Sequence, residues 1–126
     1  MQVINATTAA QIFHAFRRQL LRPFRKPLIV VSPKKMLKLR DAGSDLSEFA
    51  TGTSFQTLIP DQNPNATKTR KVIFCSGQVY YDLIAERSKH NKNDIAICRI
   101  EQLAPFPFAS LKKELAKYPN AKVEWV

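Results

Sequence analysis

The stretch Lys71-Val-Ile-Phe-Cys-Ser-Gly77 carries the clearest fold signal in the chain. Residues 71–75 form a mostly apolar run with β-branched members, which is typical of a strand, and Ser76-Gly77 supplies a tight turn. Apolar residues then recur at helical spacing up to about Lys89, and Asp94-Ile-Ala-Ile-Cys98 is a second strand-like run. A strand, a helix and a strand in this order predict a right-handed crossover within a parallel sheet.

The alternation of helix and strand continues through the last residues of the sequence. Pro107 is favourable at the start of a helix, and Val123-Glu-Trp-Val126 is a further strand-like run. The predicted helix has these residues at the spacing of an inner face: Leu111, Leu115 and Tyr118. We therefore interpret residues 71–126 as the first part of an α/β domain. We expect that domain to be truncated, because the sequence stops in a strand without a closing helix.

A β-α-β unit is predicted for residues 1–32, beginning with a strand at residues 2–4. Thr8-Ala-Ala-Gln11 has the spacing of a capping box, in which two side chains satisfy free backbone amides at a helix start. The helix is predicted over residues 9–21. Its inner face is predicted from apolar residues at steps of four: Ile12, Phe16 and Leu20. Leu28-Ile-Val-Val31 is apolar throughout, which favours a strand buried on both faces of a parallel sheet.

Residues 33–70 separate these two parts. They contain three prolines and two glycines and show no sustained hydrophobic period. We predict that this region is a linker, with one short helix near Lys34 to Leu39.

Charge is the unusual feature of the composition. The chain has 126 residues, 44% of them hydrophobic, and a formal net charge of +10. Nine basic residues precede Asp41 in one region: Arg17, Arg18, Arg22, Arg25, Lys26, Lys34, Lys35, Lys38 and Arg40. Such a region suits a nucleic acid, an anionic small molecule, an acidic protein or simple solvation. The apolar run Leu28 to Val31 is far below the roughly 20 residues that span a bilayer, which excludes a membrane-spanning helix.

The cysteines and histidines do not form a metal-binding pattern. Cys75 and Cys98 lie in apolar runs and are interpreted as buried free thiols. His14 lies within the first predicted helix, where a structural or surface role is expected, and His90 is isolated from it. We assign no catalytic residue and no metal ligand.

Four groups of residues form separate blocks along the chain. They are Phe13-His-Ala-Phe-Arg-Arg-Gln19; Arg22-Pro-Phe-Arg-Lys-Pro-Leu-Ile-Val30 with Ser32-Pro-Lys34; Phe74-Cys-Ser-Gly77 with Val79-Tyr-Tyr-Asp-Leu83; and Arg99-Ile-Glu-Gln-Leu103 with Pro105-Phe-Pro107. In this order they resemble the C-terminal third of the thiamine-diphosphate-dependent 2-oxoglutarate dehydrogenase family. The resemblance covers nearly the whole chain.

The resemblance implies a transketolase-like α/β architecture. Residues 1–32 would close the pyrimidine-side thiamine-binding domain, residues 33–70 would be a linker, and residues 71–126 would open the C-terminal domain. The resemblance implies thiamine diphosphate and Mg²⁺ as cofactors of the full-length parent. It places their ligands upstream, so the segment alone is expected to bind neither and to be inactive.

The resemblance also implies an activity and partners for the parent. The family oxidatively decarboxylates 2-oxoglutarate and succinylates the lipoyl group of the next component of its complex. The expected partners are the rest of the parent chain, its homodimer mate and the lipoyl-bearing succinyltransferase, without nucleic acid or membrane. The mitochondrial matrix is expected, or the cytoplasm for a bacterial source. The alternatives are a segment of the related 2-oxoadipate dehydrogenase and a basic nucleic-acid-binding module.

One candidate binding site follows from the resemblance. Some bacterial relatives bind AMP or acetyl-CoA where the second and third domains meet, and Arg18 and Gln102 match two of the contacting positions. We expect the Arg18 side chain to point toward Gln102. Other contacting positions fall near residues that carry no charge here: Ser54, Thr57, Ala109 and Ser110. The absence of cations at these positions would weaken the binding of a phosphate, because charge-assisted hydrogen bonds are lost.

Overall fold

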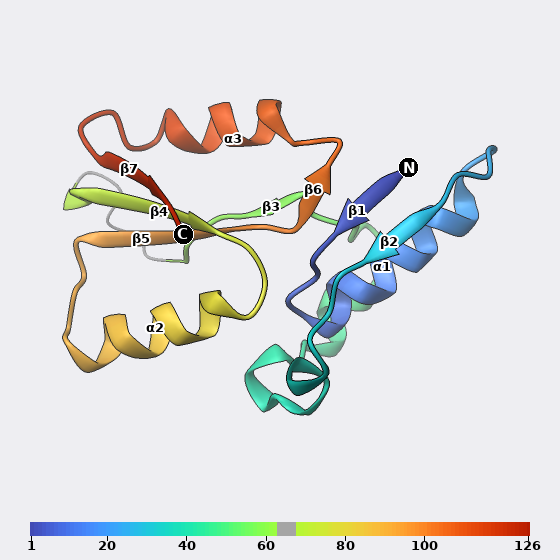
Figure 1. The fold of residues 1–126 in the computed structure, drawn as a ribbon, viewed down its shortest axis with the longest axis horizontal. Helices are drawn as coiled ribbons and strands as arrows, with labels where there is room; N and C mark the ends of the chain where they lie inside the picture. Colours follow the sequence, from blue (N-terminus) through green and yellow to red (C-terminus); the bar gives the residue numbers. More distant parts are fainter. Residues whose placement is uncertain (63–67) are drawn as a thin grey trace.

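A computed structural model describes residues 1–62 and 68–126 of the chain. Three α-helices, three 3₁₀ helices and seven strands are assigned in these ranges (Figure 1). In chain order they are β1 (Gln2–Ile4), α1 (Ala9–Leu21), β2 (Leu28–Val30), η1 (Lys34–Lys38), η2 (Arg40–Ala42), η3 (Leu46–Phe49), β3 (Leu58–Ile59), β4 (Lys71–Cys75), α2 (Val79–Lys89), β5 (Ile95–Ile100), β6 (Gln102–Ala104), α3 (Phe108–Leu115) and β7 (Lys122–Trp125).

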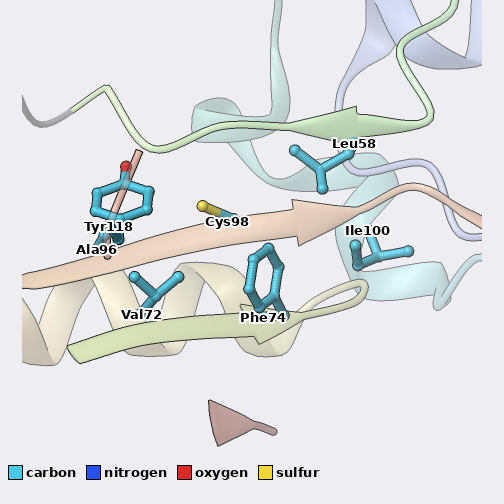
Figure 2. Close-up of a cluster of buried hydrophobic side chains, with 7 residues drawn as sticks. All are labelled: Leu58, Val72, Phe74, Ala96, Cys98, Ile100 and Tyr118. Atoms are coloured by element: carbon cyan, nitrogen blue, oxygen red, sulfur yellow. The ribbon is translucent and has the colours of Figure 1, made fainter. Parts of the chain in front are cut away.

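The larger sheet is built mainly by the second half of the chain. Its strand order is β3-β5-β4-β7, with β4 parallel to both β5 and β7 and β3 antiparallel to β5. Helices α2 and α3 lie on opposite faces of this sheet (Figure 1). The α3 side buries one apolar cluster, shown in Figure 2: Leu58, Val72, Phe74, Ala96, Cys98, Ile100 and Tyr118. The α2 side buries a smaller one, formed by Ile73, Cys75 and Ile97.

The smaller sheet has the order β2-β1-β6. Strand β1 is parallel to β2 and antiparallel to β6. Helix α1 is capped by the Thr8 hydroxyl, which accepts from the backbone N–H of Gln11, as predicted. The reciprocal half of the predicted capping box is wrong, because the Gln11 side chain hydrogen-bonds with the backbone of Gln56. The buried cluster here is small, with Ile4, Ala6 and Ala15 as its fully enclosed members.

The predictions of an α/β fold and of parallel β-α-β units are confirmed, since β1 pairs in parallel with β2 and β4 with β5 and β7, but the sheets are mixed and their antiparallel strands were not predicted. Each sheet has an antiparallel edge strand, β3 in one and β6 in the other. Both are two or three residues long. Strands this short contain no readable period of two, and only one residue separates the end of β5 from the start of β6. The hydrophobic pattern therefore could not reveal them.

The inner face predicted for α1 is wrong at two of its three positions, since only Ile12 packs against the buried cluster. Phe16 and Leu20 are 52% and 76% exposed, whereas the buried residues of α1 are Ala10, Gln11, His14 and Ala15. Helix α1 therefore buries small and polar side chains and leaves large apolar side chains exposed. Its buried polar side chains make hydrogen bonds to other parts of the chain. Strand β2 is an edge strand with Ile29 exposed, so the expected burial on both faces is not observed.

The region predicted as a linker contains the three 3₁₀ helices and β3. The short helix expected near Lys34 to Leu39 is confirmed as η1, a 3₁₀ helix. The helix expected after Pro107 is confirmed as α3, with Leu111 and Leu115 packed against the α3-side cluster and Tyr118 buried in it. The limits drawn at residues 32 and 70 stay a prediction.

Candidate functional site

The two sheets meet where β5 continues into β6, at Glu101 and Gln102. The backbone N–H groups of both residues donate to the carbonyl of Thr57, over 3.0 and 3.1 Å. The carbonyl of Glu101 accepts from the backbone N–H of Asn5, just after β1, over 2.8 Å. Two consecutive residues therefore connect the larger sheet, the smaller sheet and the segment before β3.

Glu101 is fully buried at this junction. Its carboxylate accepts from the backbone N–H of Thr7 over 2.8 Å and from the Thr7 hydroxyl over 2.5 Å. The Thr7 hydroxyl oxygen in turn accepts from Arg99 Nη1 over 2.9 Å. The hydroxyl thus bridges a buried cation and a buried carboxylate. Burial raises the pKa of Glu101, while the hydrogen bonds from Thr7 and the nearby Arg99 charge act in the opposite direction.

Two tyrosines from the start of α2 complete the junction. The Arg99 guanidinium lies over the Tyr80 ring, 4.0 Å from its centroid, and the Tyr81 hydroxyl donates to the Thr7 carbonyl.

The turn before α2 also contacts the junction. Gly77 has φ +73°, and a Cβ atom placed there would lie 2.9 Å from Asn5 Cγ. The predicted tight turn at Ser76-Gly77 therefore needs glycine for its backbone conformation and for the close approach of Asn5.

The expected proximity of Arg18 and Gln102 is confirmed. Arg18 Nη1 donates to Gln102 Oε1 over 2.9 Å, and Gln102 Nε2 donates to the Pro105 carbonyl over 2.8 Å. The Arg18 guanidinium lies over the Phe55 ring at 4.1 Å. Its Nε and Nη2 atoms are enclosed and have no hydrogen-bond partner in the described part of the chain. Burial, with a smaller effect from Arg22, lowers the pKa of Arg18.

Arg18 lines an open hollow of about 380 Å³ beside the second half of α1. Arg17 and Arg22 also line it, and Arg17 Nη1 donates to the Thr53 carbonyl over 3.2 Å. The remaining lining residues are His14, Leu21, Pro23, Thr53, Ser54 and Phe55. Three guanidinium groups around one hollow favour an anion.

The other positions carried over from the resemblance are not all at this hollow. Ser54 lines it. The hydroxyls of Thr57 and Ser110 lie 3.2 Å apart and bond to each other, and Ala109 precedes Ser110 in α3. Hydroxyl groups that pair with each other offer less to a phosphate than cations at these positions would.

The two cysteines are buried free thiols, as predicted. Burial raises the pKa of Cys75 to about 11 and that of Cys98 to about 12. His14 is buried, with Nε2 2.8 Å from the Glu48 carbonyl oxygen. Within residues 1–62 and 68–126 no group of three His, Cys, Asp or Glu side chains is placed to hold a metal ion. No helix in these ranges is long and apolar enough to cross a bilayer.

Thr7, Arg99 and Glu101 were not singled out from the sequence. The signal was present, because Arg99 and Glu101 are charged residues at the end of an otherwise apolar strand. A charge in such a strand requires a buried partner. Nothing in the sequence marks Thr7 in this way, because the adjacent Thr8 by itself accounts for the cap of α1.

The fold and site define a mixed α/β segment whose polar residues join two sheets beside an arginine-lined hollow. Residues 43–126 match the family described as 2-oxoglutarate dehydrogenase C-terminal, and the chain belongs to this family.

Three curated relatives align with nearly the whole chain. It is similar to the 2-oxoglutarate dehydrogenase E1 component of Cupriavidus necator, with 52% identity over 99% of the chain. A probable 2-oxoadipate dehydrogenase complex component E1 homolog of Dictyostelium discoideum is 51% identical over 98% of the chain. The mitochondrial 2-oxoglutarate dehydrogenase-like protein of Rattus norvegicus is 47% identical over 98%. The chain spans 13% to 14% of the length of these relatives.

Proposed function

We propose that this chain is a scaffold and interface segment of a 2-oxoglutarate dehydrogenase E1 polypeptide. The observation that carries the proposal is identity of 46% to 53% over nearly the whole chain with proteins of that name and of the 2-oxoadipate enzyme. The Glu101 junction supports the scaffold role, because the Thr7 hydroxyl joins the buried Arg99 and Glu101 at the end of the larger sheet to the segment that follows β1.

In this proposal the longer polypeptide has a transketolase-like architecture. Residues 1–32 close its second thiamine-binding domain, residues 33–70 connect, and residues 71–126 open the C-terminal domain. Thiamine diphosphate and Mg²⁺ are held by residues outside this segment, and the cofactor supplies the decarboxylation chemistry. The compartment is the mitochondrial matrix, or the cytoplasm for a bacterial source.

The first partner is the rest of the same polypeptide, together with its homodimer mate. Support comes from a set of large apolar side chains between residues 13 and 31 that this segment leaves 43% to 76% exposed: Phe13, Phe16, Leu20, Leu21, Phe24, Ile29 and Val31. An apolar set of this kind indicates an interface. The second partner is the lipoyl-bearing succinyltransferase of the complex, and neither nucleic acid nor a membrane is a partner.

The test is an assay of the longer E1 polypeptide proposed above, called the full-length chain from here on, and of the isolated residues 1–126. We expect the full-length chain to bind thiamine diphosphate with Mg²⁺ and to decarboxylate 2-oxoglutarate. The isolated segment is expected to do neither. Specific, Mg²⁺-dependent cofactor binding by the isolated segment in calorimetry would refute the scaffold proposal.

Activity on 2-oxoadipate is the second candidate, favoured by the 51% identity to the Dictyostelium 2-oxoadipate dehydrogenase homolog. Competition between the two substrates in the full-length assay separates the candidates. A kcat/KM at least tenfold higher for 2-oxoadipate, about 1.4 kcal/mol, would select the second one.

The Arg18 hollow is proposed as a binding site for a nucleotide-containing anion. An enclosed N–H without a partner costs about 1 to 3 kcal/mol, so an anion that draws Arg18 Nε and Nη2 into hydrogen bonds has a favourable contact to gain. Gln102 Oε1 accepts from the remaining guanidinium nitrogen, Arg18 Nη1, and so orients the guanidinium group.

Titration of the full-length chain with AMP tests this site. Arg18→Ala is expected to weaken binding by about 1.5 to 3 kcal/mol, the usual size of a hydrogen bond to a charged group. Arg25→Ala is the matched control, because Arg25 donates to the Arg22 carbonyl and does not line the hollow. Superimposable titrations of the Arg18→Ala and Arg25→Ala variants would reassign Arg18 to packing of the junction.

A further inference from the structure

Four of the nine basic residues that precede Asp41 lie together on two short helices and do not line the hollow beside the second half of α1. They are Lys34, Lys35 and Lys38 on η1, and Arg40 on η2. All four are exposed, and within residues 1–62 and 68–126 none of them makes an ion pair or a side-chain hydrogen bond. Asp41 is the one acidic residue between residues 32 and 43. The segment that follows β2 therefore presents a group of cations without partners.

The same segment forms one wall of a second hollow, of about 340 Å³, which we call the η1 hollow. Its other wall comes from the start of α1 and the residues just before it. The lining is mostly apolar and includes no charged residue; its apolar members include Ala6, Ala9, Ile12, Met36, Leu37 and Leu39. Leu37 is 78% exposed. An open apolar hollow of this kind suits a large apolar side chain of a binding partner.

The cations of this segment lie at the rim of the η1 hollow. Side chains three residues apart eclipse each other in a 3₁₀ helix, so Lys34 lies on the same side of η1 as Leu37, which lines the hollow. Arg40 directly follows Leu39, another lining residue. The start of α1 adds to the positive potential, because Thr8 lines the hollow and the N-terminus of a helix carries a partial positive charge. An apolar interior and a positive rim thus occur at one place.

We propose that the η1 hollow and its four cations form a docking surface for an acidic segment of a partner protein. A large apolar side chain of that segment enters the hollow, and its carboxylates lie against the lysines of η1 and against Arg40. Charge complementarity selects this partner, and the apolar anchor supplies most of the binding energy. A nucleic acid is disfavoured, because it would use aromatic side chains for base stacking and no aromatic residue among those described lines the hollow. The surface is separate from the arginine-lined hollow and does not depend on nucleotide binding there.

Fluorescence anisotropy with the full-length chain tests the surface. The probe is a labelled peptide of glutamates with two leucines among them, compared with the same peptide carrying serines in place of the leucines. Lys34→Glu/Lys38→Glu reverses the charge at the rim. Lys112→Glu/Lys113→Glu is the matched control, because it makes the same charge change at two exposed lysines of α3 that do not line the hollow. Ala9→Trp fills the hollow from an exposed position without changing the charge.

The leucine peptide is expected to bind the unaltered chain at least about tenfold more tightly than the serine peptide. Charge reversal at the rim and Ale9-site filling are each expected to weaken its binding at least about tenfold, and the α3 control by less than about twofold.

Four results would overturn the proposal: no binding of the leucine peptide, equal affinity for the two peptides, equal loss in the rim and α3 variants, or binding of anionic phospholipid vesicles through the rim lysines in place of the peptide. If the filled variant does not fold by circular dichroism, the comparison of the two peptides on the unaltered chain tests the hollow by itself.

Discussion

The two sheets of this molecule are held together by different kinds of interaction. The β3-β5-β4-β7 sheet buries apolar clusters on both faces, under α2 and α3 (Figures 1 and 2). The apolar cluster of the β2-β1-β6 sheet and α1 has only Ile4, Ala6 and Ala15 as buried members, and this part is fastened by hydrogen bonds to Glu101 and Gln102. Apolar packing tolerates small changes, whereas a buried charge that loses its partner does not. Single substitutions should therefore disturb the N-terminal part more than the C-terminal sheet.

The largest effect is expected for Thr7→Val. The substitution keeps the shape of the side chain but removes the hydroxyl between Arg99 and Glu101, leaving two buried charges without their shared partner. Opening of α1, measured by amide hydrogen exchange in the full-length chain, should become easier by about 3 kcal/mol. Thr51→Val, at an exposed threonine, is the control and should change the opening free energy by less than about 0.5 kcal/mol.

Gly77→Ala should have the next largest effect. The positive φ costs an alanine about 1 to 2 kcal/mol, and the new Cβ must displace Asn5. Thermal unfolding and hydrogen exchange in α1 and α2 should both report the loss. Gly52→Ala has a positive φ too, but its Cβ would meet no atom within 4 Å, so it isolates the backbone cost. Equal destabilisation by the two variants would show that contact with Asn5 contributes nothing.

Ile97→Val should have a smaller effect, although Ile97 is almost fully buried. It removes one methylene from the α2-side cluster, where neighbours such as Leu83 and Ile84 can relax. The expected loss is about 0.5 to 1.5 kcal/mol, confined to exchange of β4 and β5 amides. A loss as large as that of Thr7→Val would contradict the contrast between the two sheets.

The same contrast explains what the sequence could predict. Apart from β6, the elements from Lys71 onward follow from periodicity, and the α1 helix follows from its cap at Thr8; both are local properties. The inner face of α1 could not be predicted, because the large apolar residues that normally mark it, Phe16 and Leu20, are exposed in this segment. The face that is buried is chosen by contacts 34 to 94 residues away in sequence, which no local pattern encodes.

The candidate site, too, was predictable in part and unpredictable in part. The proximity of Arg18 and Gln102 followed from the family resemblance, and the structure confirms it. The hydrogen-bond partner of His14 Nε2 could not be foreseen, since the Glu48 carbonyl that it meets lies 34 residues further along the chain. That the hollow binds a nucleotide stays a proposal.

The central claim is that the Thr7–Glu101 contact fastens the N-terminal part to the larger sheet, and a double-mutant cycle tests it most directly. Thr7→Val, Glu101→Gln and the double variant are compared by the opening free energy of α1 in the full-length chain. The two residues share buried hydrogen bonds, so a coupling energy of about 1 to 3 kcal/mol is expected. Effects that add to within about 0.5 kcal/mol would show that the two side chains act independently and would contradict the claim.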